Sequence, residues 1–447
     1  MNRLRLRSAP ASSAATPARP RRARRREMPF IVLALICGAG LVSCRVLEAS
    51  GPGPPPRGAP PVVVFREDSV GPDDVDVTLV VQTSSDRARL LSLFCDRWPG
   101  RVAAAVLSPR ADDGASVVSE LADVAGCGRG EVARIESFRA TVGGMTETAR
   151  LSRGRLSLRA LTSRNDSYPI NALRNAALEL ATTSHVLVLD IDFLPSTELY
   201  GAILAQRAVL ASTERLAAIV PAFSRKGEFK DASMAEWREQ LLANRDLAPA
   251  TLATLAPCLA TGRCIQFDAT WNPDAHSTTD SARWLEQAAG YLDVAVRAAA
   301  RSLRTPPVIG RDPPSHLDQT AVPPLRFVRC FESSRYEPYL VLRRSEAPEY
   351  DENFVGYGKN KIEYVSRLRY SGFSFAVLPL GFVCHCPHPL SRDKRSWLKE
   401  PRGKRAVDRL YKAAVSGMVD NVKKDPAAAA VVNRTWLCKQ PRRRKTR

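Results

Sequence analysis

Short apolar runs alternate with amphipathic stretches from about residue 75 onward. The run at 75–82 is rich in β-branched and apolar residues and predicts a buried strand. Runs that predict further strands follow at 102–107, 132–138, 186–191 and 217–222. Stretches that predict helices lie at 85–98, 115–124, 168–182, 198–210, 234–242 and 281–303. This strand–helix alternation predicts an α/β domain with a mainly parallel sheet.

The N-terminal segment is first basic and then apolar. An Arg-rich stretch at 21–26 precedes an apolar run of 17 residues at 28–44, which is at the short end of the length that crosses a bilayer. Because the positive charge lies before the run, we expect a signal anchor with residues 1–27 in the cytosol and the rest of the chain in a lumen. A cleaved signal peptide and an organellar transit peptide are the alternatives.

Composition separates a folded domain from its flanks. Residues 45–74 are rich in Pro and Gly and predict a stem, residues 75–400 a catalytic domain, and residues 401–447 an extension with a basic tail. The net charge of +20 is concentrated at the ends, because residues 1–27 contribute +8 and residues 439–447 contribute +6. No nucleic-acid-binding module is visible in the sequence, so we expect membrane contact through the anchor and no nucleic acid partner.

The cysteines and two glycosylation sequons are compatible with a secretory lumen. Cys258 and Cys264 flank a Thr-Gly turn and are expected to form a disulfide, whereas the pairing of the other cysteines is not predicted. The sequons begin at Asn165 and Asn433. We expect a single-pass type II glycoprotein of the Golgi membrane.

The strongest local candidate for chemistry is Asp190-Ile191-Asp192, which follows a run of apolar residues. Two carboxylates at the end of a buried strand can hold Mn²⁺ or Mg²⁺ and leave coordination positions for phosphate oxygens. Such a metal neutralises the charge that develops when a nucleoside diphosphate departs from a sugar. The alternative is a pair of solvated loop carboxylates.

Two downstream segments are weaker candidates. The loop at 356–361 combines two glycines with Lys359 and Lys361, which suits a phosphate but also suits an ordinary loop before a helix. His385 or His388 can complete the metal site, or either can be a structural histidine. Cys384 and Cys386 lack the second pair of ligands that a zinc cluster needs.

Together these segments resemble glycosyltransferase family 49, which includes glucuronyltransferases of the dystroglycan-glycan pathway and the second catalytic domain of LARGE-type enzymes. Order and spacing are similar from about residue 75 to residue 398. The motifs that carry the resemblance are YPINALRN at 168–175, HVLVLDIDFLPS at 185–196, Cys264 with HSTTDSARW at 276–284, YEPYLVLRR at 336–344, PEYDENFVGYGKNK at 348–361, VLP at 377–379 and HCPH at 385–388.

The resemblance implies a single-domain GT-A fold, which is a Rossmann-like nucleotide-sugar-binding fold. It also implies Mn²⁺-dependent transfer from a UDP-sugar to a glycan or glycoprotein acceptor. Asp190, Asp192 and His385 resemble the metal ligands. The donor-site residues it implies are Asn171, Arg174, Asn175, Lys359 and Lys361.

The family is similar to inverting enzymes, which need a general base at the acceptor hydroxyl. Asp351 and Glu352 are the candidates. Other inverting GT-A enzymes place an acid just after a comparable Gly-aromatic-Gly turn, whereas this chain has Asn360 near that position, so the identity of the base stays open. Glucuronic acid is the expected donor sugar, with xylose, galactose and N-acetylglucosamine as alternatives. A catalytically silent GT-A domain with a binding role is the competing hypothesis.

Overall fold

The computed structural model describes residues 71–108, 127, 134–163, 168–227, 232–244, 247–270, 272–302, 322–424 and 436–438. All of them belong to one compact unit. The expected cytosolic tail, membrane span, helix at 115–124 and both sequons lie outside these ranges. Within them, no helix combines the length and the apolar character that crossing a membrane requires.

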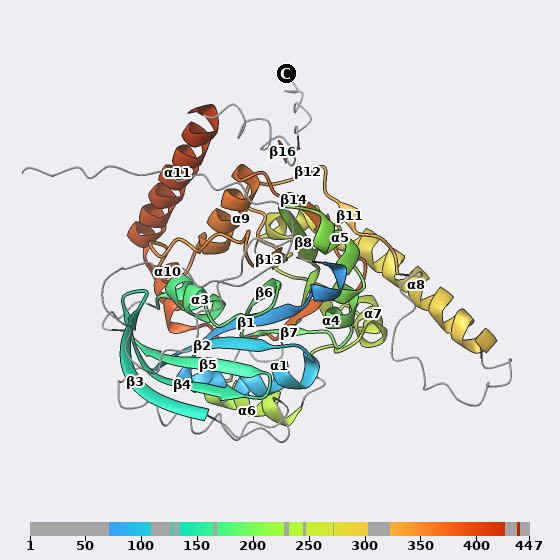
Figure 1. The fold of residues 1–447 in the computed structure, drawn as a ribbon, viewed down its shortest axis with the longest axis horizontal. Helices are drawn as coiled ribbons and strands as arrows, with labels where there is room; N and C mark the ends of the chain where they lie inside the picture. The colour runs from blue at the N-terminus through green and yellow to red at the C-terminus, as the bar shows by residue number, and fades with distance from the viewer. Residues whose placement is uncertain are drawn as a thin grey trace, which may run out of the picture. The chain divides into compact units, whose positions relative to one another are not determined.

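A ten-stranded sheet forms the centre of this unit, in the order β11-β14-β8-β13-β6-β1-β2-β5-β4-β3 (Figure 1). In the central strand β1, every side chain from Val77 to Thr83 is buried, as the continuous apolar run predicted. The strands are β1 (Val77–Ser84), β2 (Val102–Ser108), β3 (Arg134–Val142), β4 (Met145–Arg153), β5 (Leu156–Thr162), β6 (His185–Asp190), β8 (Leu216–Val220), β11 (Arg326–Phe327), β13 (Tyr339–Arg343) and β14 (Ser374–Val377).

The sheet is mixed, so the prediction of a mainly parallel sheet is wrong, although its core is parallel. Strand β1 pairs in parallel with both β2 and β6. Strand β13 runs antiparallel between β6 and β8, and β3, β4 and β5 form an antiparallel meander. Two-residue loops at 143–144 and 154–155 connect the meander, and loops this short can join only antiparallel strands.

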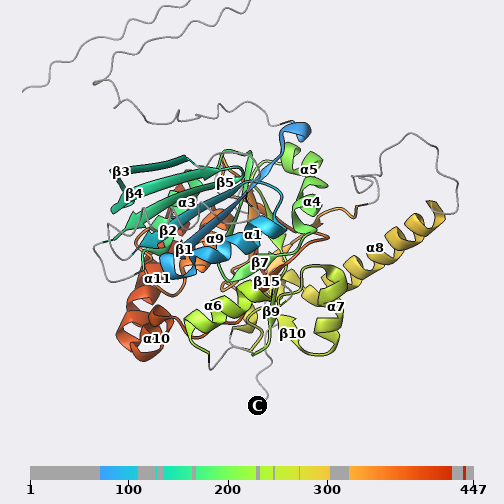
Figure 2. The same cartoon turned by 90° about the horizontal axis from the view of Figure 1, so that it is seen from below.

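Helices pack on the sheet and on one another. Helix α3 (Ile170–Leu178) packs against β1 and β2, and α9 (Asn360–Tyr370) packs against α11 (Pro401–Lys424), with α10 (Arg392–Lys399) beside it (Figures 1 and 2). The expected helix at 85–98 is a 3₁₀ segment followed by α1, and the expected helix at 198–210 is divided into α4 and α5. The remaining helices are α1 (Leu91–Arg97), α4 (Leu199–Leu204), α5 (Arg207–Ser212), α6 (Met234–Ala243), α7 (Leu252–Ala260) and α8 (Ser281–Ser302).

A second, four-stranded sheet assembles the metal-site segments. Its order is β10 (Cys264–Gln266), β9 (Ala222–Arg225), β15 (Val383–His385) and β7 (Phe193–Pro195). In this sheet His385 pairs with Phe193, the residue that follows Asp192. Residues that are far apart in the sequence therefore meet at the end of β6.

Three disulfides link described cysteines. The predicted Cys258–Cys264 bond is confirmed, and it closes the turn between α7 and β10. The structure adds Cys95–Cys127 and Cys330–Cys438, and the latter joins the short parallel strands β12 (Cys330–Phe331) and β16 (Trp436–Leu437). Cys384 and Cys386 are buried free thiols.

Candidate active site

Asp190 is the last residue of β6 and lies at the carboxyl end of the parallel core. The strand register places Gln82 of β1 directly beside it. Asp192 follows in the turn that leads into β7. Ligands of open α/β sheets bind beyond the carboxyl ends of parallel strands, so both carboxylates lie where a ligand site is expected.

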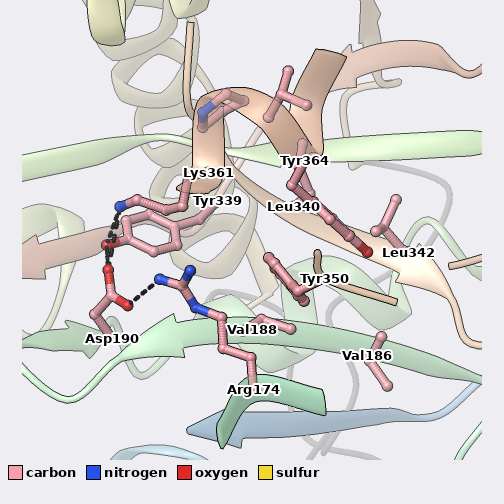
Figure 3. A pocket seen from close by; sticks show the side chains of 12 residues that line it. Arg174, Val186, Val188, Asp190, Tyr339, Leu340, Leu342, Tyr350, Lys361 and Tyr364 are labelled. Carbon is pink, nitrogen blue, oxygen red and sulfur yellow. Dashed lines mark hydrogen bonds and ion pairs between the residues drawn. The ribbon is translucent and has the colours of Figure 1, made fainter. Parts of the chain in front are cut away.

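In the described part of the chain, four side chains contact the Asp190 carboxylate, and Figure 3 draws those of Arg174, Tyr339 and Lys361. Arg174 Nη2 and Gln82 Nε2 donate to Oδ1 at 2.8 and 3.3 Å, and the Tyr339 hydroxyl and Lys361 Nζ donate to Oδ2 at 2.9 and 3.2 Å. Burial alone would raise the pKa of Asp190, but Lys361 and Arg174 lower it far below its usual value. Asp190 is therefore an ionised carboxylate held by two cations.

A small cavity of about 20 Å³ lies beneath this network, between β6, β13 and α9. Most of its wall is apolar, with Val186, Val188 and Leu340 among the lining residues (Figure 3). A space of this size holds at most a water molecule. The cavity is therefore a packing gap and cannot accept a nucleotide sugar.

Arg174 connects the Asp190 network to α9 and to the loop before it. Its Nη1 donates to Asn171 Oδ1 and to Asn360 Oδ1, each at 3.0 Å, while its guanidinium lies 5.1 Å from the centre of the Tyr350 ring. Asn171 and Arg174 are 0% and 1% exposed, so they lie below the surface that a ligand can reach. The structure thus makes them positioning residues for Asp190.

Asn175 holds the segment 350–352 in place. Its Nδ2 donates to Tyr350 O at 2.9 Å and to Glu352 at 3.0 Å, and its Oδ1 accepts from Tyr350 N at 2.8 Å. Glu352 also lies 3.3 Å from where a Cβ of Gly143 would stand, at a left-handed turn that excludes larger residues. Asn175 and Glu352 therefore bind this segment to α3 and the β3–β4 turn.

Asp192 meets both histidines of the HCPH motif. His388 Nε2 lies 2.8 Å and His385 Nε2 lies 3.6 Å from Asp192 Oδ2. One potential ligand atom from each residue lies within 4.8 Å of the others, and among the described residues Asp190 is not part of this group. The geometry thus brings in both histidines, between which the sequence left the choice open.

The second ring nitrogen of each histidine is also engaged. His388 Nδ1 lies 2.7 Å from the carbonyl oxygen of Pro389, which only accepts, so this nitrogen carries a proton. His385 Nδ1 lies 3.1 Å from Ser224 Oγ, whose hydroxyl can donate to Arg225 O. These outer contacts leave both Nε2 atoms directed at Asp192, which is the arrangement found behind metal-bound histidines.

The electrostatics of this group fit a divalent cation. The His388 Nε2 atom needs a proton to approach a carboxylate oxygen at 2.8 Å, and its pKa is raised because the hydrogen bond with Asp192 outweighs burial. Burial lowers the pKa of His385, which leaves its Nε2 lone pair free. A metal ion can replace the shared proton, and one carboxylate with two imidazoles suits Mn²⁺ and other transition metals.

Aromatic side chains enclose this part of the site. The Phe193 ring centre lies 4.6 Å from those of Phe267 and Tyr339, and 5.0 Å from that of His385. Lys361 Nζ lies 4.5 Å from the centre of the Tyr339 ring. The low-polarity wall strengthens the charge interactions among Asp190, Lys361 and the Asp192, His385 and His388 group.

The remaining residues predicted from sequence lie elsewhere. Lys359 Nζ pairs with Asp408 of α11 at 2.7 Å and lies over the Tyr411 ring, so it does not join Lys361 at Asp190. The Asp351 carboxylate accepts from the backbone and side chain of Asn353 and lies 3.7 Å from Arg367. These contacts fix local structure and do not connect Lys359 or Asp351 with the metal-ligand group.

Two partners of Asp190 were not found by sequence reasoning. Gln82 reaches Asp190 only because β1 and β6 pair in register, and Tyr339 reaches it only because β13 is antiparallel to β6. The signal that could have indicated Tyr339 is its place in the YEPYLVLRR motif, immediately before a buried run. Asp268 and Glu337, two carboxylates near Lys361, were also missed.

Comparison with known proteins agrees with the motif order. Xylosyl- and glucuronyltransferase LARGE2 of Mus musculus is 28% identical over 341 residues, which are 76% of this chain and 38% of that protein. LARGE2 of Homo sapiens is 29% identical over 73% of this chain and 35% of its own length, and LARGE1 of Homo sapiens is 28% identical over 72% and 32%. The chain spans about a third of the length of these curated relatives.

Solved structures overlap this fold less closely. The crystal structure of GalNAc-T7 with UDP, GalNAc and Mn²⁺ matches 71% of this chain and 45% of its own, with a TM-score of 0.34 and 8% identity.

The family match is much longer than any single motif. Residues 76–312 and 315–412 match the family described as Glycosyl-transferase for dystroglycan. These ranges contain the Asp190 network and the Asp192, His385 and His388 group. The chain therefore belongs to this family, glycosyltransferase family 49.

Proposed function

We propose that the protein is a metal-dependent, inverting glycosyltransferase that transfers a sugar from a UDP-sugar to a glycan acceptor. The observation that carries this proposal is the convergence of Asp192, His385 and His388 beside the ionised Asp190. A silent domain has no need to keep two imidazoles and a carboxylate directed at one point. The mixed α/β sheet fits the GT-A-like fold that the family implies.

Glucuronic acid is the first donor sugar to test and xylose the second. The support is the similarity to relatives named as xylosyl- and glucuronyltransferases. We also propose that residues 28–44 anchor the chain as a type II protein in the Golgi membrane, with the catalytic domain in the lumen.

The chain's own residues divide the work at this site. Asp192, His385 and His388 would hold Mn²⁺, and the bound ion would neutralise charge on the departing diphosphate. Arg174 and Lys361 hold Asp190 ionised and fixed at the end of β6. Lys361, which belongs to α9, contacts Asp190, so its ammonium group can also offer positive charge to a phosphate.

The test is a donor screen with the full chain and Mn²⁺. UDP-glucuronic acid, UDP-xylose, UDP-galactose and UDP-N-acetylglucosamine are offered with a panel of 4-nitrophenyl glycosides, with and without EDTA. We expect one donor to be used, EDTA to abolish transfer, and the new linkage to have inverted anomeric configuration by NMR. Binding of UDP without turnover of any donor would favour the silent-domain hypothesis instead.

A further inference from the structure

The general base of the proposed transfer has no assignment, and Asp351 and Glu352 are engaged in structural contacts. Glu352 is tied to Asn175 and Asp351 to Asn353. Asn360, which stands near the position of an acid in other inverting enzymes, accepts from Arg174 and is 8% exposed. These contacts favour another carboxylate near the site as the base.

Tyr357 is an exposed side chain in the loop before α9. Its ring is 44% exposed, on the loop that α10 covers, where a Cβ on Gly358 would stand 2.6 Å from Trp397. Burial, and after it the charges of Glu337, Asp268, Asp192 and Asp190, raise the pKa of the Tyr357 hydroxyl. Glu337 and Asp268 therefore act electrostatically on the same hydroxyl as the Asp190–Asp192 pair already described.

From this geometry we propose that Glu337 is the catalytic residue that accepts the proton of the acceptor hydroxyl. The inference rests on the proposed function. Glu337 lies two residues before Tyr339, whose hydroxyl is 2.9 Å from Asp190 Oδ2 and 3.1 Å from Lys361 Nζ. Its backbone N–H donates to Ala275 O at 3.0 Å, so the main chain at Glu337 is fixed on both sides.

The Glu337 side chain has a defined position, and its carboxylate can still accept a proton. It is partly exposed, between the buried side chains of Tyr336 and Tyr339. Among the described residues, its one hydrogen bond is a long contact of 3.5 Å from Asn272 Nδ2. A base needs this combination of a fixed position and an oxygen that can still accept a proton.

Asp268 is the competing carboxylate. Burial raises the pKa of Asp268, against the opposing charges of Lys394, Lys361, His385 and Arg335. Burial also raises the pKa of Glu337, against Lys361, and the negative charges of Asp268 and Asp190 add to the increase. Because both pKa values shift in the same direction, position decides between them: Glu337 leads directly into Tyr339, whose hydroxyl contacts Asp190.

The step balances without a further reactant. The acceptor oxygen forms a bond to the anomeric carbon, and the bond from that carbon to the diphosphate oxygen breaks. Its electron pair leaves with UDP, and the acceptor proton moves to a Glu337 carboxylate oxygen.

The test compares Glu337→Gln with Asp268→Asn and with Glu332→Gln, an exposed glutamate five residues upstream. We measure transfer from the donor identified in the screen, the pH–rate profile, and Mn²⁺-dependent binding of UDP by calorimetry. We expect Glu337→Gln to lower kcat at least 100-fold and to remove the acidic limb of the profile, with UDP affinity changed less than threefold. Asp268→Asn should lose less than tenfold and Glu332→Gln should match the wild type.

Transfer within tenfold of wild type in Glu337→Gln, or a greater loss in Asp268→Asn, would overturn the assignment. A wild-type protein that neither binds UDP with Mn²⁺ nor transfers sugar overturns the proposed function itself. The UDP-binding readout therefore separates failure of this inference from failure of the function on which it rests.

Discussion

Lys359 and Lys361 are two residues apart, yet their ammonium groups bind different carboxylates. Lys361 Nζ lies 3.2 Å from Asp190 Oδ2, whereas Lys359 Nζ lies 2.7 Å from Asp408 Oδ1 on α11. Lys359 adopts a left-handed backbone conformation, with φ of 55°, and α9 begins immediately after it. The two side chains of the KNK sequence therefore have separate tasks, one at the site and one at the α9–α11 contact.

This pair provides a matched test of the site. Lys361→Ala should lower transfer about 100-fold, which corresponds to about 2.7 kcal/mol of transition-state stabilisation. Lys359→Ala should stay within about threefold, because a partly exposed ion pair contributes about 1 kcal/mol or less to stability. Steady-state kinetics of both variants decide this, and equal losses would contradict the separation.

Substitution of the proposed metal ligands Asp192 and His388 should weaken metal binding while the fold stays intact. His388→Ala and Asp192→Asn should each weaken Mn²⁺ binding at least tenfold in calorimetry and lower transfer in proportion. Asp74→Asn changes an exposed aspartate that is far from Asp192 and His388 in the sequence, and it serves as the control. Wild-type Mn²⁺ affinity in His388→Ala would exclude His388 as a ligand and leave Asp192 and His385.

Removal of the Arg174 guanidinium should affect stability as well as activity. Arg174→Ala leaves Asp190 and Asn360 without their shared partner in a buried position. We expect a loss of about 3–5 kcal/mol in the free energy of unfolding, measured with urea. Arg238→Ala removes a partly exposed arginine of α6 whose side chain donates to Asp86 O and pairs with Glu239, and it should lose about 1 kcal/mol or less.

His185 predicts an acid-sensitive stability that is independent of the metal. Burial, and then the charge of Arg343, lowers its pKa from 6.5 to about 4. His185 is therefore protonated near pH 6.5 in the unfolded chain but only near pH 4 in the folded chain. Unfolding free energy should fall across this window as pH is lowered, by at most about 3 kcal/mol.

Urea unfolding in EDTA at pH 7, 5.5 and 4.5 tests this, with His185→Asn as the comparison. The variant should be less stable at pH 7, because the ring contact with Ser184 Oγ is lost. It should also show a shallower decrease on acidification. Parallel pH dependences in the two proteins would show that His185 does not control the effect.

The sequence predicted those parts of the fold that depend on local pattern. The apolar runs that became β1, β2 and β6 were placed within a few residues, and the Cys258–Cys264 bond was found because it spans a short turn. Strand direction was not predictable in the same way. Strand β13 looks like any other apolar run, and only tertiary pairing makes it antiparallel to β6.

The same limit applies to the site. Asp190 and Asp192 were visible because they follow a buried strand within one short segment. The choice between His385 and His388 could not be made, because it depends on how β15 pairs with β7 and on the outer contacts with Ser224 and Pro389. Motif resemblance placed Lys359 and Lys361 together, and only the structure separates them.

The Cys330–Cys438 bond has a consequence for how this protein can be made. The bond joins two residues that are 108 positions apart, so it closes a large covalent ring with the chain between them. The ring includes Glu337, Lys361, His385 and His388, which are the proposed base, a lysine that contacts Asp190 and two of the three proposed metal ligands. Expression in a reducing cytosol would leave Cys330 and Cys438 unpaired. Expression in an oxidising compartment would form the bond that joins β12 to β16, so metal binding should be measured on protein made in this way.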